Sequence, residues 1–329
     1  MAFKDIEGQE RAIEFFRNSV NKERLAHAYL FLGAPGEGKA LLARNLVKFL
    51  NCESPVSQGD VFTDCCDICA SCRKIDNFNH PDVHWIERKG KSISIDDIRI
   101  LQRQMSLKRY EGKTKVFIIL EVRHMTEEAA NSLLKTLEEP PDDSLIILTS
   151  STLSGLLPTI ISRCQIVKFY PLKLEKLKEI LIQRYGLSND EAHFLSAQAE
   201  GRIGRALSLK EEGALGEKNR LIESVSRFDR GEAAVDIFNI KDKKELARQI
   251  RYLLIWFRDI LVFKAGLSLS SIINADRAGI VKSQAQRFDF EDLEEIIYGI
   301  NEAQRMIEQN VNPKIVLEVM TRGIAGCRK

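Results

Sequence analysis

The chain has 329 residues, more than a single hydrophobic core normally holds, so two or three domains are expected. Hydrophobic residues make up 44% of the sequence and charged residues 29%, which excludes a disordered or collagen-like chain. The 49 lysines and arginines nearly balance the 47 aspartates and glutamates, so any contact with nucleic acid has to come from a local patch or from a larger assembly.

No stretch of the sequence suits a membrane. Residues 144–162 are uncharged but contain many hydroxyl residues, a glycine and a proline, and the apolar residues 251–264 include Arg258 and Asp259. The first residues lack the apolar run of a signal peptide, which favours a cytoplasmic location. We therefore expect no membrane partner.

The first half of the chain alternates short apolar runs with helical patterns. The runs that predict buried strands are residues 28–32, 115–120, 145–148 and 165–169. Strands that alternate with helices indicate an α/β domain built on a parallel sheet with both faces covered. From Pro171 onward only helical periodicity remains, so we predict a small helical domain to about residue 210 and a longer helical domain to the end.

A phosphate-binding loop is predicted between the first strand and its helix. Gly33, Gly36 and Gly38 allow backbone N–H groups to turn toward phosphate oxygens, and Lys39 supplies a positive charge. The alternative is a plain strand-to-helix turn. Strand, glycine spacing, lysine and helix coincide here, which favours the phosphate loop.

The metal ligands that normally accompany such a loop are missing at two positions. An active loop has a serine or threonine after the lysine to bind Mg²⁺, whereas this chain has Ala40. The next buried strand should end in an aspartate, but Leu120 occupies that position and only the following Glu121 is retained. We therefore predict an inactive ATPase module that does not bind ATP and Mg²⁺ productively, with Lys39 left as a weak nucleotide contact.

Four cysteines have the spacing of a structural zinc site. Cys66, Cys69 and Cys72 form a tight cluster, and Cys52 lies shortly before it at the end of the loop helix. Four thiolates leave no open position for water, so the predicted role is structural. Cys65 is an alternative to Cys66, although only Cys66 keeps the two-residue spacing, and free thiols in a loop are the other alternative.

The chain resembles the tau/gamma/delta-prime family of bacterial clamp-loader proteins in the AAA+ superfamily. The matching segments extend over essentially the whole chain and are residues 25–31, 79–83, 94–99, 110–113, 131–141, 162–164 and 310–314. The runs Leu-Leu-Lys-Thr-Leu-Glu-Glu-Pro-Pro and Ser-Arg-Cys are the most specific to this family. The resemblance implies three parts, which are an AAA+ phosphate-loop domain (1–169) with an inserted zinc module (about 52–72), a helical lid (170–210) and a helical collar (211–329).

Within this family, the departures favour the ATPase-defective stator, or delta-prime, group over the ATP-hydrolysing tau/gamma motors. Besides Ala40 and Leu120, the chain has Gly204 where the resemblance places the motor's nucleotide-sensing arginine, and Arg205 comes one position late. We therefore expect no ATPase activity of its own, within a DNA polymerase III assembly that is a DNA-directed DNA polymerase. The alternatives are an active tau/gamma-type subunit and a stand-alone AAA+ enzyme that remodels DNA.

The resemblance also implies a role for Arg163 as an arginine finger that reaches the γ-phosphate held by a neighbouring motor subunit. A surface ion pair is the alternative for this residue. The implied partners are a tau/gamma motor subunit, the delta subunit, the sliding clamp through weak or indirect contact, and the backbone of primed DNA. Four basic residues on and near a predicted helix have two interpretations, contact with DNA phosphates or a solvated helix face. They are Arg99, Arg103, Lys108 and Arg109.

Overall fold

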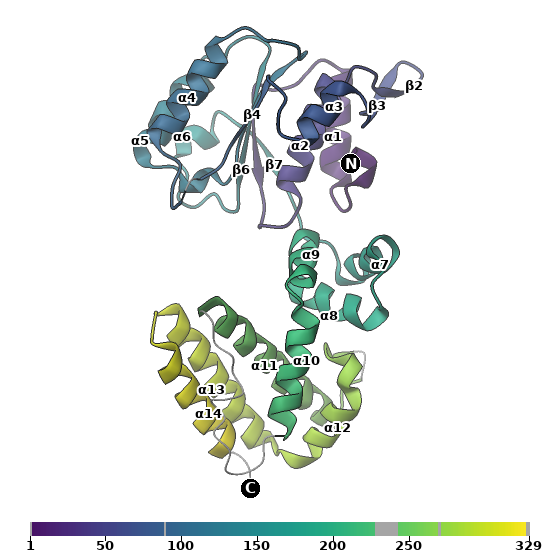
Figure 1. Cartoon of the computed structure of the whole chain (residues 1–329), viewed down its shortest axis with the longest axis vertical. Helices are drawn as coiled ribbons and strands as arrows, with labels where there is room; N and C mark the ends of the chain where they lie inside the picture. Colours follow the sequence, from purple (N-terminus) through teal and green to yellow (C-terminus); the bar gives the residue numbers. More distant parts are fainter. Residues whose placement is uncertain (1, 89, 228–242, 269–270, 327–329) are drawn as a thin grey trace. The chain divides into compact units, whose positions relative to one another are not determined.

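A computed structural model describes residues 2–88, 90–227, 243–268 and 271–326 (Figure 1). The chain divides into two compact units. The first comprises Met1–Lys173 with Arg202–Arg205, and the second comprises Leu174–Gly201 with Ala206–Lys329. Each unit has its own architecture, one of the α/β class and the other of the all-α class.

The first unit is built on a five-stranded parallel sheet. Its strands are β1 (Ala28–Leu32), β4 (Val83–Ile86), β5 (Lys115–Ile119), β6 (Ser144–Ser150) and β7 (Gln165–Lys168). Their order across the sheet is β4-β5-β6-β1-β7, and every neighbouring pair is parallel. The sequence predicted four of these strands and the parallel sheet, and both are confirmed, but β7 was expected to be buried and is mostly exposed because it lies at the sheet edge. It did not predict β4, because this short edge strand carries half-buried polar and aromatic side chains instead of an apolar run.

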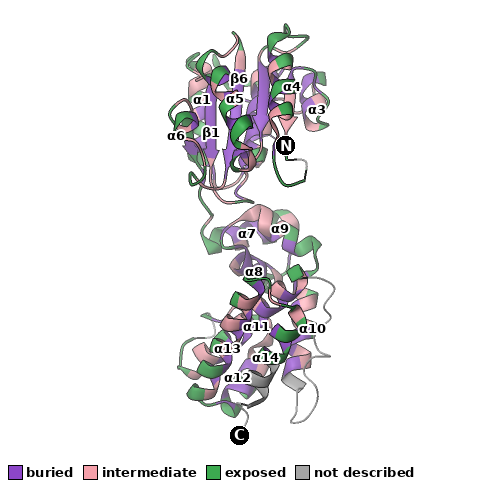
Figure 2. Ribbon diagram, turned by 90° about the vertical axis from the view of Figure 1, so that its left-hand side faces the viewer, coloured by how far each residue is buried: buried purple, intermediate pink, exposed green. Residues whose placement is uncertain are grey.

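Helices cover both faces of the sheet, as Figure 2 shows by the buried strands between them. The helices of the first unit are η1 (Phe3–Asp5), α1 (Glu10–Asn21), α2 (Lys39–Asn51), α3 (Ala70–Asp76), α4 (Ile95–Ser106), η2 (Val122–His124), α5 (Glu127–Glu138) and α6 (Pro158–Ile161). Successive side chains of β1 point to opposite faces, so Tyr29 packs with α1 and α2 while Leu30 packs with α4 and α5. This two-sided burial explains why the strand is apolar throughout.

An insertion between α2 and β4 carries the cysteine-rich segment. It consists of an antiparallel hairpin of β2 (Val56–Gln58) and β3 (Val61–Asp64), followed by α3. The hairpin is exposed, but its last residue, Asp64, is buried and accepts hydrogen bonds from the backbone N–H groups of Phe3 and Lys4. The insertion is therefore fastened to the first residues of the chain.

The second unit is helical wherever it is described. Its elements are α7 (Leu174–Tyr185), α8 (Asn189–Ala199), α9 (Ile203–Glu211, whose first three residues belong to the first unit), α10 (Ala214–Arg227), α11 (Lys243–Lys264), η5 (Ala275–Arg277), α12 (Ala278–Arg287), α13 (Phe290–Glu308) and α14 (Pro313–Gly326). α13 packs between α11 and α14 and buries Leu293 and Ile300. The helical character that the sequence predicted after Pro171 is thus confirmed for the described residues, and its two longest helices are α11 and α13. Among the described helices, none is long and apolar enough to cross a bilayer.

Candidate nucleotide and metal sites

The predicted phosphate loop lies at the carboxyl end of β1 and leads directly into α2. Gly36 and Gly38 have φ angles of 89° and 91°, a backbone region that glycine adopts without the steric cost other residues incur. Gly38 is the N-cap of α2, so the helix begins at Lys39 with its N–H groups at the loop. The local backbone therefore has the form that the sequence predicted.

Lys39 is held by the protein itself. Its Nζ donates hydrogen bonds to the backbone oxygens of Gly33 and Ala34, the latter at 3.1 Å. The same Nζ lies 3.3 Å from Oε1 of Glu121, and the lysine side chain is only 7% exposed. The charge that would neutralise a phosphate is thus already balanced by a carboxylate and by loop carbonyls.

The chain has no oxygen ligand at the two expected metal-binding positions. Ala40 and Leu120 line the same cavity beside the loop. Glu121, which follows Leu120, has a left-handed φ of 49°, and its Oε2 accepts a hydrogen bond from the N–H of Ser151. The structure therefore brings the predicted nucleotide-site residues to one end of the sheet, but the retained carboxylate faces the lysine.

Glu37 is a feature of the loop that the sequence analysis did not single out. It is 7% exposed, and burial raises the pKa of its carboxyl group, opposed by the backbone N–H of Ala34 and the charges of Lys39 and Arg202. Its Oε2 is buried without a hydrogen-bond partner among the described residues. An acidic residue inside a glycine-rich loop was the available sequence signal, because a carboxylate opposes phosphate binding.

Gly204 approaches the phosphate loop closely. Its N–H donates a 2.9 Å hydrogen bond to the backbone oxygen of Gly36. A Cβ atom at position 204 would lie 3.0 Å from the Cα of Gly36, and a Cβ on Gly36 would lie 2.9 Å from the backbone nitrogen of Arg205. A side chain at either position would therefore require the facing backbone to shift, so this close contact disfavours an arginine at position 204.

The four predicted cysteine ligands come together. The Sγ atoms of Cys52, Cys66, Cys69 and Cys72 all lie within 4.8 Å of one another, and those of Cys52 and Cys72 are 3.8 Å apart. Four sulfur ligands placed about 2.3 Å from a tetrahedral Zn²⁺ are separated by about 3.8 Å, so this donor set fits that ion. Cys65 is not part of the group, and its Sγ faces Oδ1 of Asp67 at 4.0 Å.

Backbone N–H groups support the thiolate form of these cysteines. Cys66 N–H points to Cys52 Sγ at 3.3 Å, and Cys69 N–H points to Cys66 Sγ at the same distance. Burial raises the pKa of Cys66, but the N–H groups of Ile68 and Cys69 outweigh it and lower that pKa to about 7. Burial raises the pKa of Cys52 to about 12, so deprotonation at this position needs a bound cation.

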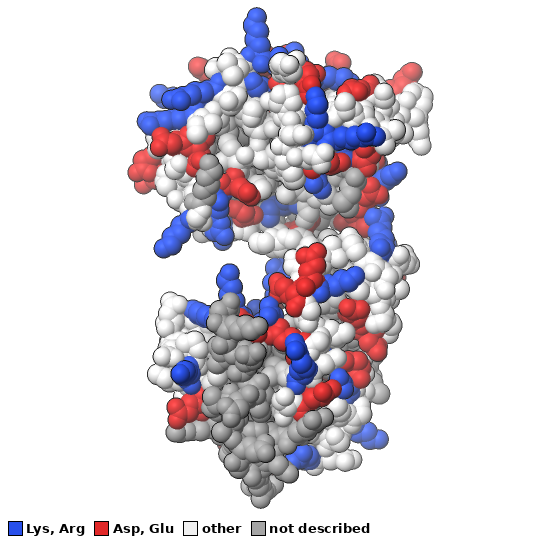
Figure 3. Space-filling model, in the orientation of Figure 1, with Lys and Arg blue, Asp and Glu red and all other residues white. Residues whose placement is uncertain are grey.

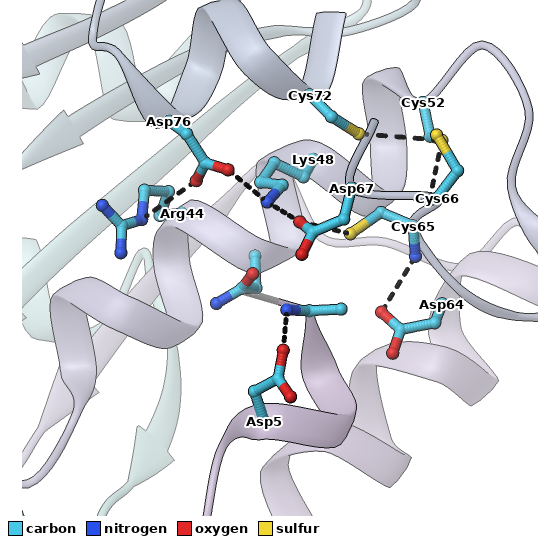
Figure 4. Close-up of polar contacts among 12 residues, drawn as sticks. Asp5, Arg44, Lys48, Cys52, Asp64, Cys65, Cys66, Asp67, Cys72 and Asp76 are labelled. Atoms are coloured by element: carbon cyan, nitrogen blue, oxygen red, sulfur yellow. Dashed lines mark hydrogen bonds and ion pairs between the residues drawn. The ribbon is translucent and has the colours of Figure 1, made fainter. Parts of the chain in front are cut away.

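A buried lysine links the cysteine segment to the phosphate-loop helix (Figure 4). Lys48 of α2 is fully buried, and its Nζ contacts Oδ1 of Asp67 and, at 2.7 Å, Oδ2 of Asp76. Burial alone lowers the pKa of Lys48, but these two carboxylates raise it above its usual value. The sequence analysis missed this residue, although a lysine among the apolar residues of α2 was a visible signal.

The loop before β5 is held by Asp82 and is also linked to the four-cysteine cluster. Asp82 is buried, and its carboxylate accepts hydrogen bonds from the N–H groups of Tyr110, Glu111 and Gly112 at 2.7–3.1 Å. Burial raises the pKa of Asp82, but these three N–H groups outweigh it and lower that pKa below its usual value. In the same loop, Lys113 Nζ donates a 2.6 Å hydrogen bond to the backbone oxygen of Cys52.

Arg163 lies between α6 and β7 at the surface of the first unit. Its Nη1 donates a 3.0 Å hydrogen bond to the backbone oxygen of Thr159, and its Nη2 pairs with Oε1 of Glu138. The Arg163 side chain is 33% exposed and that of Glu138 is 48% exposed. The ion-pair alternative is thus present in the structure, with a solvent-facing guanidinium whose partner is itself accessible to water.

The four basic residues proposed for phosphate contact lie on and after α4. Arg99 pairs with Asp96 at 3.2 Å, and Arg109 pairs with Asp143 at 2.8 Å. Figure 3 shows lysines and arginines over the α4 and α5 side of the first unit, with acidic side chains close to them. The arrangement fits two interpretations equally well. One is a basic patch, and the other is a solvated helix face whose charges are balanced.

The comparisons with known proteins match nearly the whole chain. The family described as "DNA polymerase III, delta subunit" matches residues 8–173, and "DNA polymerase III, delta subunit, C terminal" matches residues 212–323. The chain is 31% identical over 318 residues to DNA polymerase III subunit delta' of Bacillus subtilis (strain 168), with 94% of each protein covered. It is 27% identical to subunit tau of the same organism, covering 96% of this chain and 60% of tau.

Among solved structures, a DNA polymerase III gamma subunit-related protein from Thermotoga maritima has a TM-score of 0.49 and 18% identity to the chain. That alignment covers 98% of this chain and 100% of the other.

Proposed function

Because the chain belongs to the DNA polymerase III delta-subunit family, we propose that it is a delta-prime stator of the clamp loader, without ATPase activity of its own. The observation that carries this proposal is the pairing of Lys39 with Glu121 next to two positions, Ala40 and Leu120, that offer no metal ligand. Phosphoryl transfer depends on Mg²⁺ and on positive charge at the phosphates. This site has neither a protein ligand for the ion nor an unpaired lysine.

The glycine contact supports the same conclusion. In the rival proposal, an active tau/gamma-type motor, a nucleotide-sensing arginine would occupy position 204. The hydrogen bond from Gly204 to Gly36 and the tight contact that a Cβ would make there disfavour that role. A stand-alone AAA+ enzyme that remodels DNA would need the same missing metal ligands, so the stator is the better explanation.

The proposed contribution of this chain to catalysis is Arg163. Its guanidinium is held at the surface by Thr159 and Glu138, two contacts that orient it but leave it accessible. An exposed ion pair of this kind stabilises a protein by about 0–1 kcal/mol, so exchanging Glu138 for a neighbour's phosphate has a low cost. We propose that Arg163 makes this exchange in the assembled complex and stabilises charge on the γ-phosphate held by a motor subunit.

The proposed cofactor is one structural Zn²⁺ held by Cys52, Cys66, Cys69 and Cys72. The tetrahedral spacing of the sulfurs and the N–H groups directed at them support this ion. When bound, Zn²⁺ would supply only cross-linking, because four protein ligands leave no position for water or substrate. Through Cys52, at the end of α2, the ion would fasten the inserted segment to the phosphate-loop helix.

The remaining parts of the proposal concern assembly. We propose residues 1–169 as the AAA+ domain, 170–210 as a lid and 211–329 as a collar that binds the other subunits. The proposed partners are a tau/gamma motor, the delta subunit, the sliding clamp through weak or indirect contact, and the backbone of primed DNA. Arg99, Arg103, Lys108 and Arg109 would supply the DNA contacts, which would be insensitive to sequence.

The absence of ATPase activity is tested with the purified full chain. We expect no Mg²⁺-dependent ATP hydrolysis, and we expect Lys39→Ala to behave like the wild type. The double variant Ala40→Thr/Leu120→Asp restores a hydroxyl and a carboxylate, so it should bind ATP more tightly with Mg²⁺ than without it. The matched control Ala40→Val/Leu120→Asn keeps similar shapes without the charge and the hydroxyl. Hydrolysis by the wild-type chain alone would contradict the proposal.

A further inference from the structure

A cavity of about 480 Å³ lies beside the phosphate loop, at the carboxyl ends of β4 and β5. Its apolar lining includes Ala40, Leu41 and Leu120. An active site would have metal ligands at positions 40 and 120. Ala40 and Leu120 place apolar side chains there instead, so this wall of the cavity is apolar. Crevices at the carboxyl ends of parallel strands are the usual ligand sites of such sheets, and cavities of this volume suit small molecules.

Two aromatic side chains complete the apolar surface of the cavity. Phe78 and Trp85 both line it, with ring centroids 5.2 Å apart and planes at 72°. The cavity therefore presents two aromatic rings beside its aliphatic wall, a lining that suits an aromatic ligand.

Arg44 gives the cavity a cationic group. It extends from α2, one helical turn after Ala40, and its Cζ lies 5.8 Å from the centroid of the Phe78 ring. Its Nε is buried, makes no hydrogen bond among the described residues, and forms an ion pair with Oδ1 of Asp76 at 3.6 Å (Figure 4). Asp76 also pairs with Lys48 at 2.7 Å, so its single charge is shared and Arg44 is only partly neutralised. Glu87 also lines the cavity, but it is exposed, so water and salt screen its charge.

We propose that this cavity binds a small, flat aromatic molecule that carries one anionic group. The aromatic body would pack against Phe78, Trp85 and the apolar wall, and the anion would accept hydrogen bonds from Arg44. Lys39 is not among the lining residues, so the ligand does not use the phosphate-binding lysine. The proposal is therefore independent of the proposed function and does not depend on whether the chain hydrolyses ATP.

Two dyes of nearly the same shape test the proposal on the full chain. The first, 8-anilinonaphthalene-1-sulfonate, has the proposed chemistry, and N-phenyl-1-naphthylamine is its neutral counterpart. Each is titrated while its fluorescence is recorded. For Arg44→Gln we expect binding of the sulfonate to weaken about tenfold, the loss of one charge-assisted contact, with binding of the neutral dye changed less than about twofold.

A second variant tests the position of the site. Ala40 is exposed at the cavity wall, so Ala40→Phe should fill the space without disturbing the core and should remove saturable binding of both dyes. Arg305→Gln, which changes an exposed arginine of α13 in the second unit, is the matched control and should leave both affinities unchanged. Thermal unfolding confirms that the variants are folded. The proposal is overturned if Ala40→Phe binds both dyes like the wild type, or if Arg44→Gln weakens both dyes equally.

Discussion

At the scale of single residues, the ion pairs in the phosphate-loop region join segments that are far apart in the sequence. Gly36, Gly38 and Lys39 form a local motif whose backbone conformation follows from the residue types alone. The contact between Lys39 and Glu121 joins two different strands' ends, and so it depends on the folded sheet. The same reason explains why Lys48 was missed, since its carboxylate partners lie in the inserted segment.

Asp82 carries a pH-dependent contribution to stability that can be measured. Its pKa is lowered in the folded chain, so the carboxylate stabilises the fold above its unfolded pKa of about 3.9, and this contribution is lost as the pH falls through the lower, folded value. Asp82→Asn retains the shape of the side chain but removes the negative charge that accepts hydrogen bonds from three backbone N–H groups. We expect it to reduce the free energy of unfolding in urea by about 1.5–3 kcal/mol at pH 7.

The difference between wild type and Asp82→Asn should shrink as the pH is lowered from 7 to 3. Asp96→Asn is the matched control, because Asp96 is 77% exposed and pairs with Arg99 on the same helix. Its effect should stay within about 0.5 kcal/mol. An Asp82→Asn penalty that is the same at pH 3 and pH 7 would contradict the role given to the carboxylate.

At the scale of elements, what the sequence predicts depends on burial. β1, β5 and β6 are buried on both faces, so they appear as continuous apolar runs and were predicted. β4 lies at the sheet edge, and the β2–β3 hairpin is exposed, so neither has an apolar run or a regular alternation. The cysteine spacing predicted the metal-ligand group but not the strands around it, because ligand chemistry, unlike a strand, does not need an apolar pattern.

The inserted segment should depend on its metal. We expect the purified chain to contain one zinc ion, which elemental analysis would detect and a strong chelator would release. Removal should loosen the segment between α2 and β4, whose β2–β3 hairpin is largely exposed, so protease cleavage should appear within residues 53–71 while the sheet remains intact.

Two cysteine variants separate the proposed ligand from its neighbour. Cys66→Ser should lower the zinc content, whereas Cys65→Ser should retain it, because only Cys66 belongs to the ligand group. If Cys66→Ser kept its full zinc content and Cys65→Ser lost it, Cys65 and not Cys66 would be the fourth ligand. No zinc in the wild-type chain would end the proposal of a metal centre.

At the scale of the whole molecule, family membership assigns the chain to DNA polymerase III, and the site geometry suggests a division of labour within that assembly. The all-α second unit was predicted as a class, because helical periodicity persists from Pro171 onward. The role of Arg163 was implied only by resemblance, and one chain alone does not contain the phosphate that it would contact. The role of Arg163 therefore has to be tested in a complex that contains a motor subunit.

The most direct measurement is steady-state ATP turnover by the reconstituted clamp loader containing wild-type, Arg163→Ala or Lys176→Ala chain. Both side chains are at least partly exposed and each pairs with one carboxylate, so neither variant should impair folding or assembly. Our account predicts that Arg163→Ala slows the motor site it faces by about 10³-fold or more, the usual contribution of an arginine finger, while Lys176→Ala changes turnover little. Equal turnover by fully assembled wild-type and Arg163→Ala complexes would contradict it.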